Sequence, residues 1–204
     1  MARLHSRIFY ALMIISFLLF TAGAQADGYY AGIAGGQTEF EGGISAGKGT
    51  TIKDISSAGY VFFGREFDDN FAVEGFYANL GEAKLSGETG ATFKVEGDEY
   101  RISDGTTFIA TAKSVGIAGK YHVDLHAKTR LIAKLGLHSW KIKGKISNTV
   151  DNLRVNDDGI DVMSGLGIEY AATEKVALMA GMDGFGIEDE TILMTYVGLK
   201  LSFD

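Results

Sequence analysis

The residues best suited to chemistry are a neighbouring histidine and serine, His138 and Ser139, in the sequence LHSW. Nucleophilic catalysis by serine needs a histidine base within hydrogen-bond reach of the hydroxyl. The flanking residues alternate between apolar and polar, which predicts a strand, and neighbours on a strand point to opposite faces. His122 and His126 lie beside a predicted short turn, and His5 lies in a segment expected to be removed. No base and nucleophile meet the reach requirement, so we predict that the chain is not an enzyme.

Candidate metal and phosphate sites lack the necessary spacing. The sequences DGIDVM (158–163) and GIEDE (186–190) supply carboxylates, but not in the pattern of a calcium loop. GGISAGKGT (42–50) resembles a phosphate-binding loop only superficially, and we expect it to be a surface loop. The chain has no cysteine, which excludes thiolate metal ligands and disulfides. We therefore predict no metal and no cofactor.

Charged residues occur instead at alternate positions of apolar segments. Glu74 lies on the opposite face from Val73 and Tyr77, and the pattern recurs along the chain. The polar faces carry both signs of charge, at Glu74, Lys120, Lys134, Glu169 and Lys200. An unpaired buried charge costs several kcal/mol. If these faces point inward, the charges must pair with one another.

Period-two alternation places these charges on strands rather than helices. Turn or loop residues flank about eight strand-like segments, at 28–40, 58–67, 71–80, 108–123, 129–144, 160–170, 176–185 and 196–204. Short connections at 68–70, 124–128 and 171–175 alternate with long polar ones at 41–56, 81–106 and 145–158. Short turns on one side and long loops on the other are typical of outer-membrane β-barrels.

The N-terminal residues predict export. Arg3 and Arg7 precede the apolar run 8–20, and the small-residue pattern Ala24-Gln25-Ala26 follows. A spanning helix needs about 20 apolar residues, so this shorter run is typical of a cleaved signal peptide. We predict a signal peptide at 1–26 and one domain at 27–204. The whole chain has a net charge of −7, which argues against a nucleic-acid partner.

Alternation alone does not distinguish a soluble barrel from a membrane barrel. Export favours the membrane, and lipid requires a closed, even set of strands, so the last strand, at 196–204, must pair with the first, at 28–38. Aromatic residues also lie at strand ends beside the short turns, as a membrane-interface girdle would require. The residues predicted to form this girdle are Tyr29, Tyr30, Phe67, Phe71, Tyr121, Tyr170 and Phe203. The predicted fold is an all-β, eight-stranded antiparallel up-and-down transmembrane β-barrel.

Three segments resemble the OmpA-type small outer-membrane β-barrel family: GREFDDNFAVEGFYANLG, GLGIEYAATEKVAL and VGLKLSF. The resemblance covers essentially all of 27–204. It implies that Glu74, Lys134 and Glu169 pair inside the lumen. One inward arginine of the family falls at Met179 here, and Lys120 and Lys200 are expected to replace it. The resemblance also implies that Phe203 is the terminal aromatic read by the barrel-assembly machinery.

The resemblance implies a structural and surface-interaction role, in envelope integrity and in adhesion or immune evasion, at the outer membrane of a Gram-negative cell. The expected partners are outer-membrane lipid and lipopolysaccharide, the barrel-assembly machinery, and host surface molecules that contact the extracellular loops. The main alternative is a narrow porin or a channel for small hydrophobic solutes. A lipid A-modifying enzyme is less favoured, because His138 and Ser139 do not match the required pattern.

Overall fold

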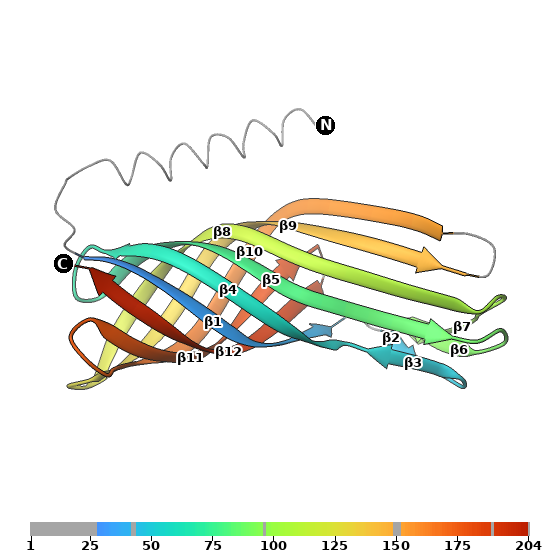
Figure 1. The fold of residues 1–204 in the computed structure, drawn as a ribbon, viewed down its shortest axis with the longest axis horizontal. Coiled ribbons are helices and arrows are strands. Elements are labelled where there is room, and N and C mark those ends of the chain that lie inside the picture. Colours follow the sequence, from blue (N-terminus) through green and yellow to red (C-terminus); the bar gives the residue numbers. More distant parts are fainter. Residues whose placement is uncertain (1–27, 42–43, 96, 149–151, 189, 204) are drawn as a thin grey trace, which may run out of the picture.

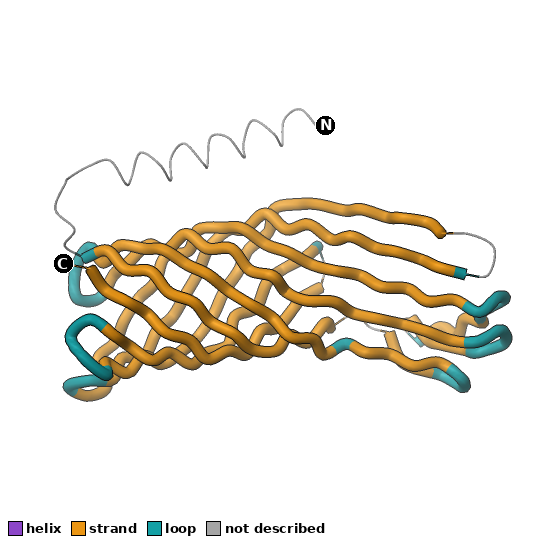
Figure 2. The backbone as a smooth tube through the Cα atoms, in the orientation of Figure 1, coloured by secondary structure: helices purple, strands orange, loops and turns teal. Residues whose placement is uncertain are grey.

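The computed structural model describes residues 28–41, 44–95, 97–148, 152–188 and 190–203. These residues form strands joined by turns and short connections (Figures 1 and 2). The predicted signal peptide and Asp204 lie outside the described residues. Among the residues described, no helix is long and apolar enough to cross a membrane. The strands are β1 (Tyr29–Glu41), β2 (Ile44–Ala46), β3 (Thr50–Lys53), β4 (Ile55–Glu66), β5 (Phe71–Gly87), β6 (Thr92–Val95), β7 (Asp98–Arg101), β8 (Thr106–His126), β9 (Thr129–Ser147), β10 (Asn152–Ala171), β11 (Val176–Ile187) and β12 (Glu190–Phe203).

Eight long strands close into a barrel, which confirms the predicted fold. They follow one another around the wall in the order β1, β4, β5, β8, β9, β10, β11 and β12, and every neighbouring pair is antiparallel. β12 pairs with β1 from Tyr29 opposite Phe203 to Glu41 opposite Thr191. This pairing removes the open sheet edges that hydrocarbon does not tolerate.

The wall has an apolar outer face and a mixed inner face. On β9, Leu131, Leu135 and Leu137 are exposed on the outside, whereas Ile132 and Lys134 are buried inside. The other long strands show the same alternation, because successive side chains of a strand point to opposite faces. In a bilayer the exposed aliphatic side chains contact acyl chains.

The two ends of the barrel differ (Figure 2). At the short-turn end, residues 67–70, 127–128 and 172–175 connect the strands. At the opposite, extended end, the hairpins of β5, β8, β9 and β10 project beyond the rest of the wall, and β2, β6 and β7 form a small separate sheet (Figure 1).

Three predicted loops are therefore wrong in part, because each contains strand. The segment 145–158 belongs mostly to β9 and β10, which pair as far as Ser147 opposite Asn152. The segment 41–56 contains β2 and β3, and 81–106 contains the end of β5 and all of β6 and β7. Outside the hydrocarbon layer the outer face of a strand becomes polar, so its sequence no longer shows an apolar face to lipid. In β5 an irregularity between Asn79 and Glu82, where Gly81 has φ +78°, also shifts the alternation.

One of the seven predicted girdle residues is wrong. Tyr30 is 1% exposed and points into the barrel, because it alternates with Tyr29 on β1. Phe67, Phe71, Tyr121, Tyr170 and Phe203 are exposed near the short-turn end, as predicted.

Candidate functional site: a charged and aromatic lumen

A buried carboxylate forms the centre of the lumen. Glu74, on β5, is 0% exposed. Its carboxylate accepts hydrogen bonds from Lys120 Nζ at 3.0 Å, Tyr60 OH at 2.6 Å and Tyr30 OH at 3.2 Å. Lys134 Nζ lies 3.9 Å from its Oε1 atom. Two buried lysines and two buried tyrosines therefore surround one carboxylate.

Asp183 extends this cluster across β10. Lys134 Nζ donates a hydrogen bond to Asp183 Oδ2 at 2.9 Å, and Tyr196 OH donates one to Oδ1 at 3.5 Å. Lys134 therefore lies between two carboxylates, those of Glu74 and Asp183. The sequence reasoning did not identify Asp183, although its position on β11, alternating with outward-facing Met182, was a usable signal.

A glycine makes the contact between Lys134 and Asp183 possible. Gly165, on β10, is the register partner of both residues. A Cβ atom at this position would overlap the carboxylate of Asp183. Because glycine has no side chain, Asp183 of β11 and Lys134 of β9 can contact each other across β10.

A second cluster lies toward the short-turn end. Lys200 Nζ donates hydrogen bonds to Glu169 Oε1 at 2.5 Å and to Glu66 Oε1 at 2.9 Å. Arg130 Nη1 lies 3.8 Å from Glu66 Oε1, and Arg130 Nε lies 3.7 Å from Asp124 Oδ1. The sequence reasoning missed Glu66, because it lies at the end of β4, where the apolar alternation stops.

The structure thus divides the five predicted lumen charges between two groups. Glu74, Lys120 and Lys134 contact one another, while Glu169 and Lys200 form a separate pair. Met179, at the family's arginine position, is buried on the inner face.

Aromatic rings fill much of the space around these charges. Lys134 Nζ lies 4.9 Å from the ring centroid of Tyr60 and 5.0 Å from that of Tyr196, and Lys120 Nζ lies 4.8 Å from that of Tyr30. The Tyr60 ring stacks against those of Phe76 and Tyr196. Cation–π contacts of this kind stabilise a lysine that has left water.

The prediction that no serine and histidine meet is wrong. Ser114, on β8, lies 2.8 Å from His138 Nδ1, measured at its Oγ atom. The serine that contacts His138 therefore lies on the neighbouring strand, diagonally across from it, and is not the adjacent residue Ser139. The sequence prediction did not consider diagonal contacts between strands. Ser114 is 2% exposed and His138 is 1% exposed, and the histidine ring packs against Phe185. Ser114 and His138 are therefore buried among other side chains and are not accessible to lipid or solvent.

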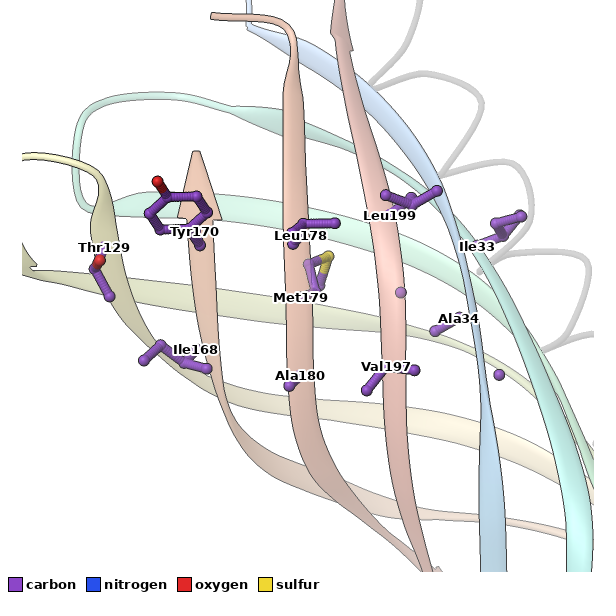
Figure 3. Close-up of a pocket in the computed structure, with 12 residues that line it drawn as sticks. Ile33, Ala34, Thr129, Ile168, Tyr170, Leu178, Met179, Ala180, Val197 and Leu199 are labelled. Atoms are coloured by element: carbon purple, nitrogen blue, oxygen red, sulfur yellow. The ribbon is translucent and has the colours of Figure 1, made fainter. Parts of the chain in front are cut away.

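A broad depression lies on the lipid-facing side of the wall. It measures about 1020 Å³ and extends over β9, β10, β11, β12 and β1 (Figure 3). Ile33, Leu178, Val197 and Leu199 are exposed along it. Acyl chains fill such an apolar surface in a bilayer, so it is not a candidate polar site. In the described part of the chain, no group of three or more His, Asp or Glu is placed to hold a metal ion.

Phe203 lies at the short-turn end, in the last register pair of β12 with β1, opposite Tyr29. Its side chain is exposed on the outer face. This location is compatible with the predicted assembly role, which stays a prediction.

Comparisons with known proteins agree with this architecture. A family model described as "Outer membrane protein beta-barrel domain" matches residues 9–203. The chain is similar to the attachment invasion locus protein Ail of Yersinia pestis, with 13% identity, coverage of 85% of this chain and 98% of that chain, and a TM-score of 0.51. It is also similar to the N-terminal β-barrel domain of Pseudomonas aeruginosa OprF, with 14% identity, coverage of 85% and 97%, and a TM-score of 0.52. These identities show the fold alone. No curated protein sequence matches the chain.

Proposed function

We propose that this chain, which belongs to the outer membrane protein β-barrel domain family, is a closed structural barrel that acts through its surface. Its place is the outer membrane. The finer role is stabilisation of the envelope and contact with molecules outside the cell, by adhesion or immune evasion. Residues 1–26 are proposed to be the cleaved signal peptide, and Phe203 the residue read by the assembly machinery.

The observation that carries the proposal is the packed lumen. Glu74 and Lys120 are each 0% exposed, and the tyrosine rings pack against the lysines beside them. An ion crossing the barrel would have to separate buried charge pairs, which costs about 3–5 kcal/mol when one partner is left alone. A barrel built in this way is suited to a structural role rather than to free diffusion.

The extended end supports the surface role. Its strands continue beyond the apolar wall, and many of the residues there are polar and exposed or half-buried. In the short-turns-inside orientation of outer-membrane barrels, this end faces the outside of the cell. One structure similar in fold, with a TM-score of 0.50 and 12% identity, is titled as Ail of Yersinia pestis in complex with the heparin analogue sucrose octasulfate. Sulfated glycans therefore belong among the ligands to be tested.

A narrow pore is the second candidate function. One observation favours it: Glu74 lies within 4.0 Å of both Lys120 and Lys134, so one carboxylate has two available cationic partners. A change in the preferred partner would rearrange this part of the lumen, and Lys134 would keep Asp183 as its second carboxylate partner throughout.

Planar-bilayer recording of the refolded barrel separates the two functions. The structural role predicts no sustained single-channel openings, for the wild type and for the surface variant Glu99→Gln alike. Regular openings in the wild type that disappear in Lys134→Met would favour the pore and contradict the closed barrel.

A further inference from the structure

A small polar cavity lies at the short-turn end of the barrel, where β12 closes against β1. It measures about 230 Å³, and Gly28, the first residue that the structure describes, lines it. Its charged lining residues are of both signs: Glu66, Arg130, Glu169, Glu174, Lys175 and Lys200. We call it the seam cavity, because it lies beside the seam at which the first and last strands pair.

One carboxylate oxygen of the seam cavity lacks a hydrogen-bond donor. Glu169 is 3% exposed, and its Oε1 atom accepts a hydrogen bond from Lys200 Nζ. Its other oxygen, Oε2, is buried and accepts no hydrogen bond from any residue that the structure describes. Lys200 Nζ also donates to Glu66 Oε1 at 2.9 Å, so one lysine is shared between two carboxylates. Because buried polar atoms are almost always hydrogen-bonded, Oε2 points to a donor outside the described ranges.

The arginine of the seam cavity does not supply this donor. Arg130 Nη1 lies 3.8 Å from Glu66 Oε1, and Arg130 Nε lies 3.7 Å from Asp124 Oδ1. Among the ion pairs of the described residues, Glu169 is joined only to Lys200. The missing donor must therefore come from a group that reaches the cavity from elsewhere.

The polypeptide enters the barrel beside this carboxylate. The Gly28 carbonyl oxygen accepts a hydrogen bond from Glu66 N at 2.7 Å. Gly28 has φ +82°, and a Cβ atom there would lie 2.6 Å from the Glu66 carbonyl oxygen. Glycine is therefore required at this turn, which holds the chain against the end of β4. The nitrogen of the preceding residue lies within about 5 Å of the Gly28 Cα atom, since consecutive Cα atoms are about 3.8 Å apart.

Cleavage of the signal peptide would change the chemistry of that nitrogen. The proposed signal peptide ends at Ala26, which leaves Asp27 as the first residue of the mature chain. In the uncleaved chain the nitrogen of Asp27 belongs to a neutral amide with one N–H group. After cleavage it is an α-amino group, which is protonated at neutral pH because its ordinary pKa is about 8. A cationic N–H donor is the strongest partner for an unbonded carboxylate oxygen.

We infer that the α-ammonium group produced by signal-peptide cleavage binds in the seam cavity and donates a hydrogen bond to Glu169 Oε2. This inference rests on the proposed function, because it needs cleavage after Ala26. The additional cation gives Glu169 a partner of its own beside the shared Lys200. Processing thereby completes the charge network next to the β1–β12 seam. The precursor lacks this contact, because its amide carries no charge.

A thermodynamic cycle tests the contact. The chain 27–204 is released from a fusion by a protease that leaves Asp27 as the first residue, and it is refolded in phospholipid vesicles. In a matched sample, transamination with pyridoxal phosphate in urea converts the α-amine to a ketone and leaves the lysine amines intact. Both forms are prepared for the wild type, Glu169→Gln and Asp183→Asn. Asp183 is the control, since it is a buried lumen carboxylate that does not line the seam cavity.

Blocking the α-amine should lower the folding equilibrium constant of the wild type about tenfold in urea titrations, as expected for loss of one charge-assisted hydrogen bond. The same block should change that of Glu169→Gln by less than about twofold, because the charged acceptor is already absent. Asp183→Asn is less stable throughout, but the block should still cost it about tenfold, since distant sites are additive.

The labelling rate of the α-amine is a second measurement, which needs no variant. At about pH 6.5 an N-hydroxysuccinimide ester reacts preferentially with the α-amine, because lysine amines have a higher pKa. A bound α-ammonium should be labelled about tenfold more slowly in the folded barrel than in urea, the same factor as in the stability, because only the released form reacts. Mass spectrometry of the N-terminal peptide measures this rate.

Two outcomes would overturn the inference. They are an equal effect of the block in the wild type and Glu169→Gln, and labelling of the folded wild type at the rate seen in urea. Mass spectrometry of the protein isolated from outer membranes separates these from a failure of the proposed function. A chain that begins at Asp27 but shows no coupling contradicts the inference alone. A chain that begins elsewhere contradicts the proposed signal peptide, and the inference with it.

Discussion

Glu74→Ala is the most informative perturbation of the lumen. The substitution removes the only carboxylate that contacts Lys120 within 4.0 Å in the described part of the chain. It also removes the acceptor of two buried tyrosine hydroxyls, those of Tyr30 and Tyr60. Lys134 keeps its second partner, Asp183 at 2.9 Å. The damage is therefore concentrated on one lysine and two hydroxyl groups.

The expected loss of unfolding free energy follows from these contacts. Removing one partner of a buried ion pair costs about 3–5 kcal/mol. Each buried hydroxyl left without an acceptor adds about 1–3 kcal/mol, but water entering the space vacated by the side chain recovers part of this. Since the contributions share one site and do not add, we expect a total loss of about 4–6 kcal/mol. Glu74→Gln should cost less, because the amide oxygen still accepts from a tyrosine.

Urea unfolding in phospholipid vesicles, followed by heat-modifiable migration on gels, measures this loss. Glu99→Ala is the matched control, since Glu99 is an exposed residue of β7 with no expected effect on stability. A double-mutant cycle of Glu74→Gln and Lys120→Met should show a coupling of about 1–3 kcal/mol, because the double variant leaves no charge unpaired. A loss below about 0.5 kcal/mol for Glu74→Ala would refute the reasoning, since only a hydrated or outward-facing carboxylate could be removed so cheaply.

Three further predictions concern the wall, the lumen glycine and the topology. Leu199→Arg, on the lipid face, should cost about 2–4 kcal/mol in vesicle folding, and a harmless arginine would contradict the lipid-facing assignment. Gly165→Ala should cost about 1–3 kcal/mol in urea unfolding, because the added methyl group displaces Asp183 from Lys134. Gly59→Ala is the control and should be neutral, since an added Cβ there meets nothing within 4 Å. Equal effects of the two substitutions would contradict the proposed role of Gly165 in the contact between Lys134 and Asp183. In intact cells a membrane-impermeant maleimide should label Glu99→Cys at the extended end and not Asp69→Cys at a short turn, and the reverse pattern would invert the topology.

The fold was predictable because every membrane strand carries the same local signal. An outward residue must be apolar in lipid, so the period-two pattern remains clear from Phe71 to Tyr77 and from Thr129 to Leu137. The signal ends where the strands leave the hydrocarbon layer. The ends of β9 and β10, with Lys141, Lys143 and Lys145 and the polar residues opposite them on their outer faces, were therefore mistaken for a loop.

The contacts of the lumen were less predictable than its composition. Alternation identifies which residues face inward, but the partner of each charge depends on the register of several strands together. Lys134 reaches Asp183 across Gly165 on an intervening strand, and Ser114 meets His138 on a diagonal. Neither contact corresponds to a fixed number of residues between its two partners, because the loops between these strands do not fix that number.

Buried ion pairs add little net stability to a folded protein, because desolvation offsets most of the attraction. In this barrel the lumen charges disfavour alternative registers of the strands. A slip of one residue in any strand moves its inner set of side chains to the lipid face. For β9 that slip would place Lys134 in hydrocarbon, at a cost of about 2–4 kcal/mol for the lysine alone. Lys120 and Lys200 impose the same penalty on β8 and β12. The lumen charges therefore fix the register of the wall.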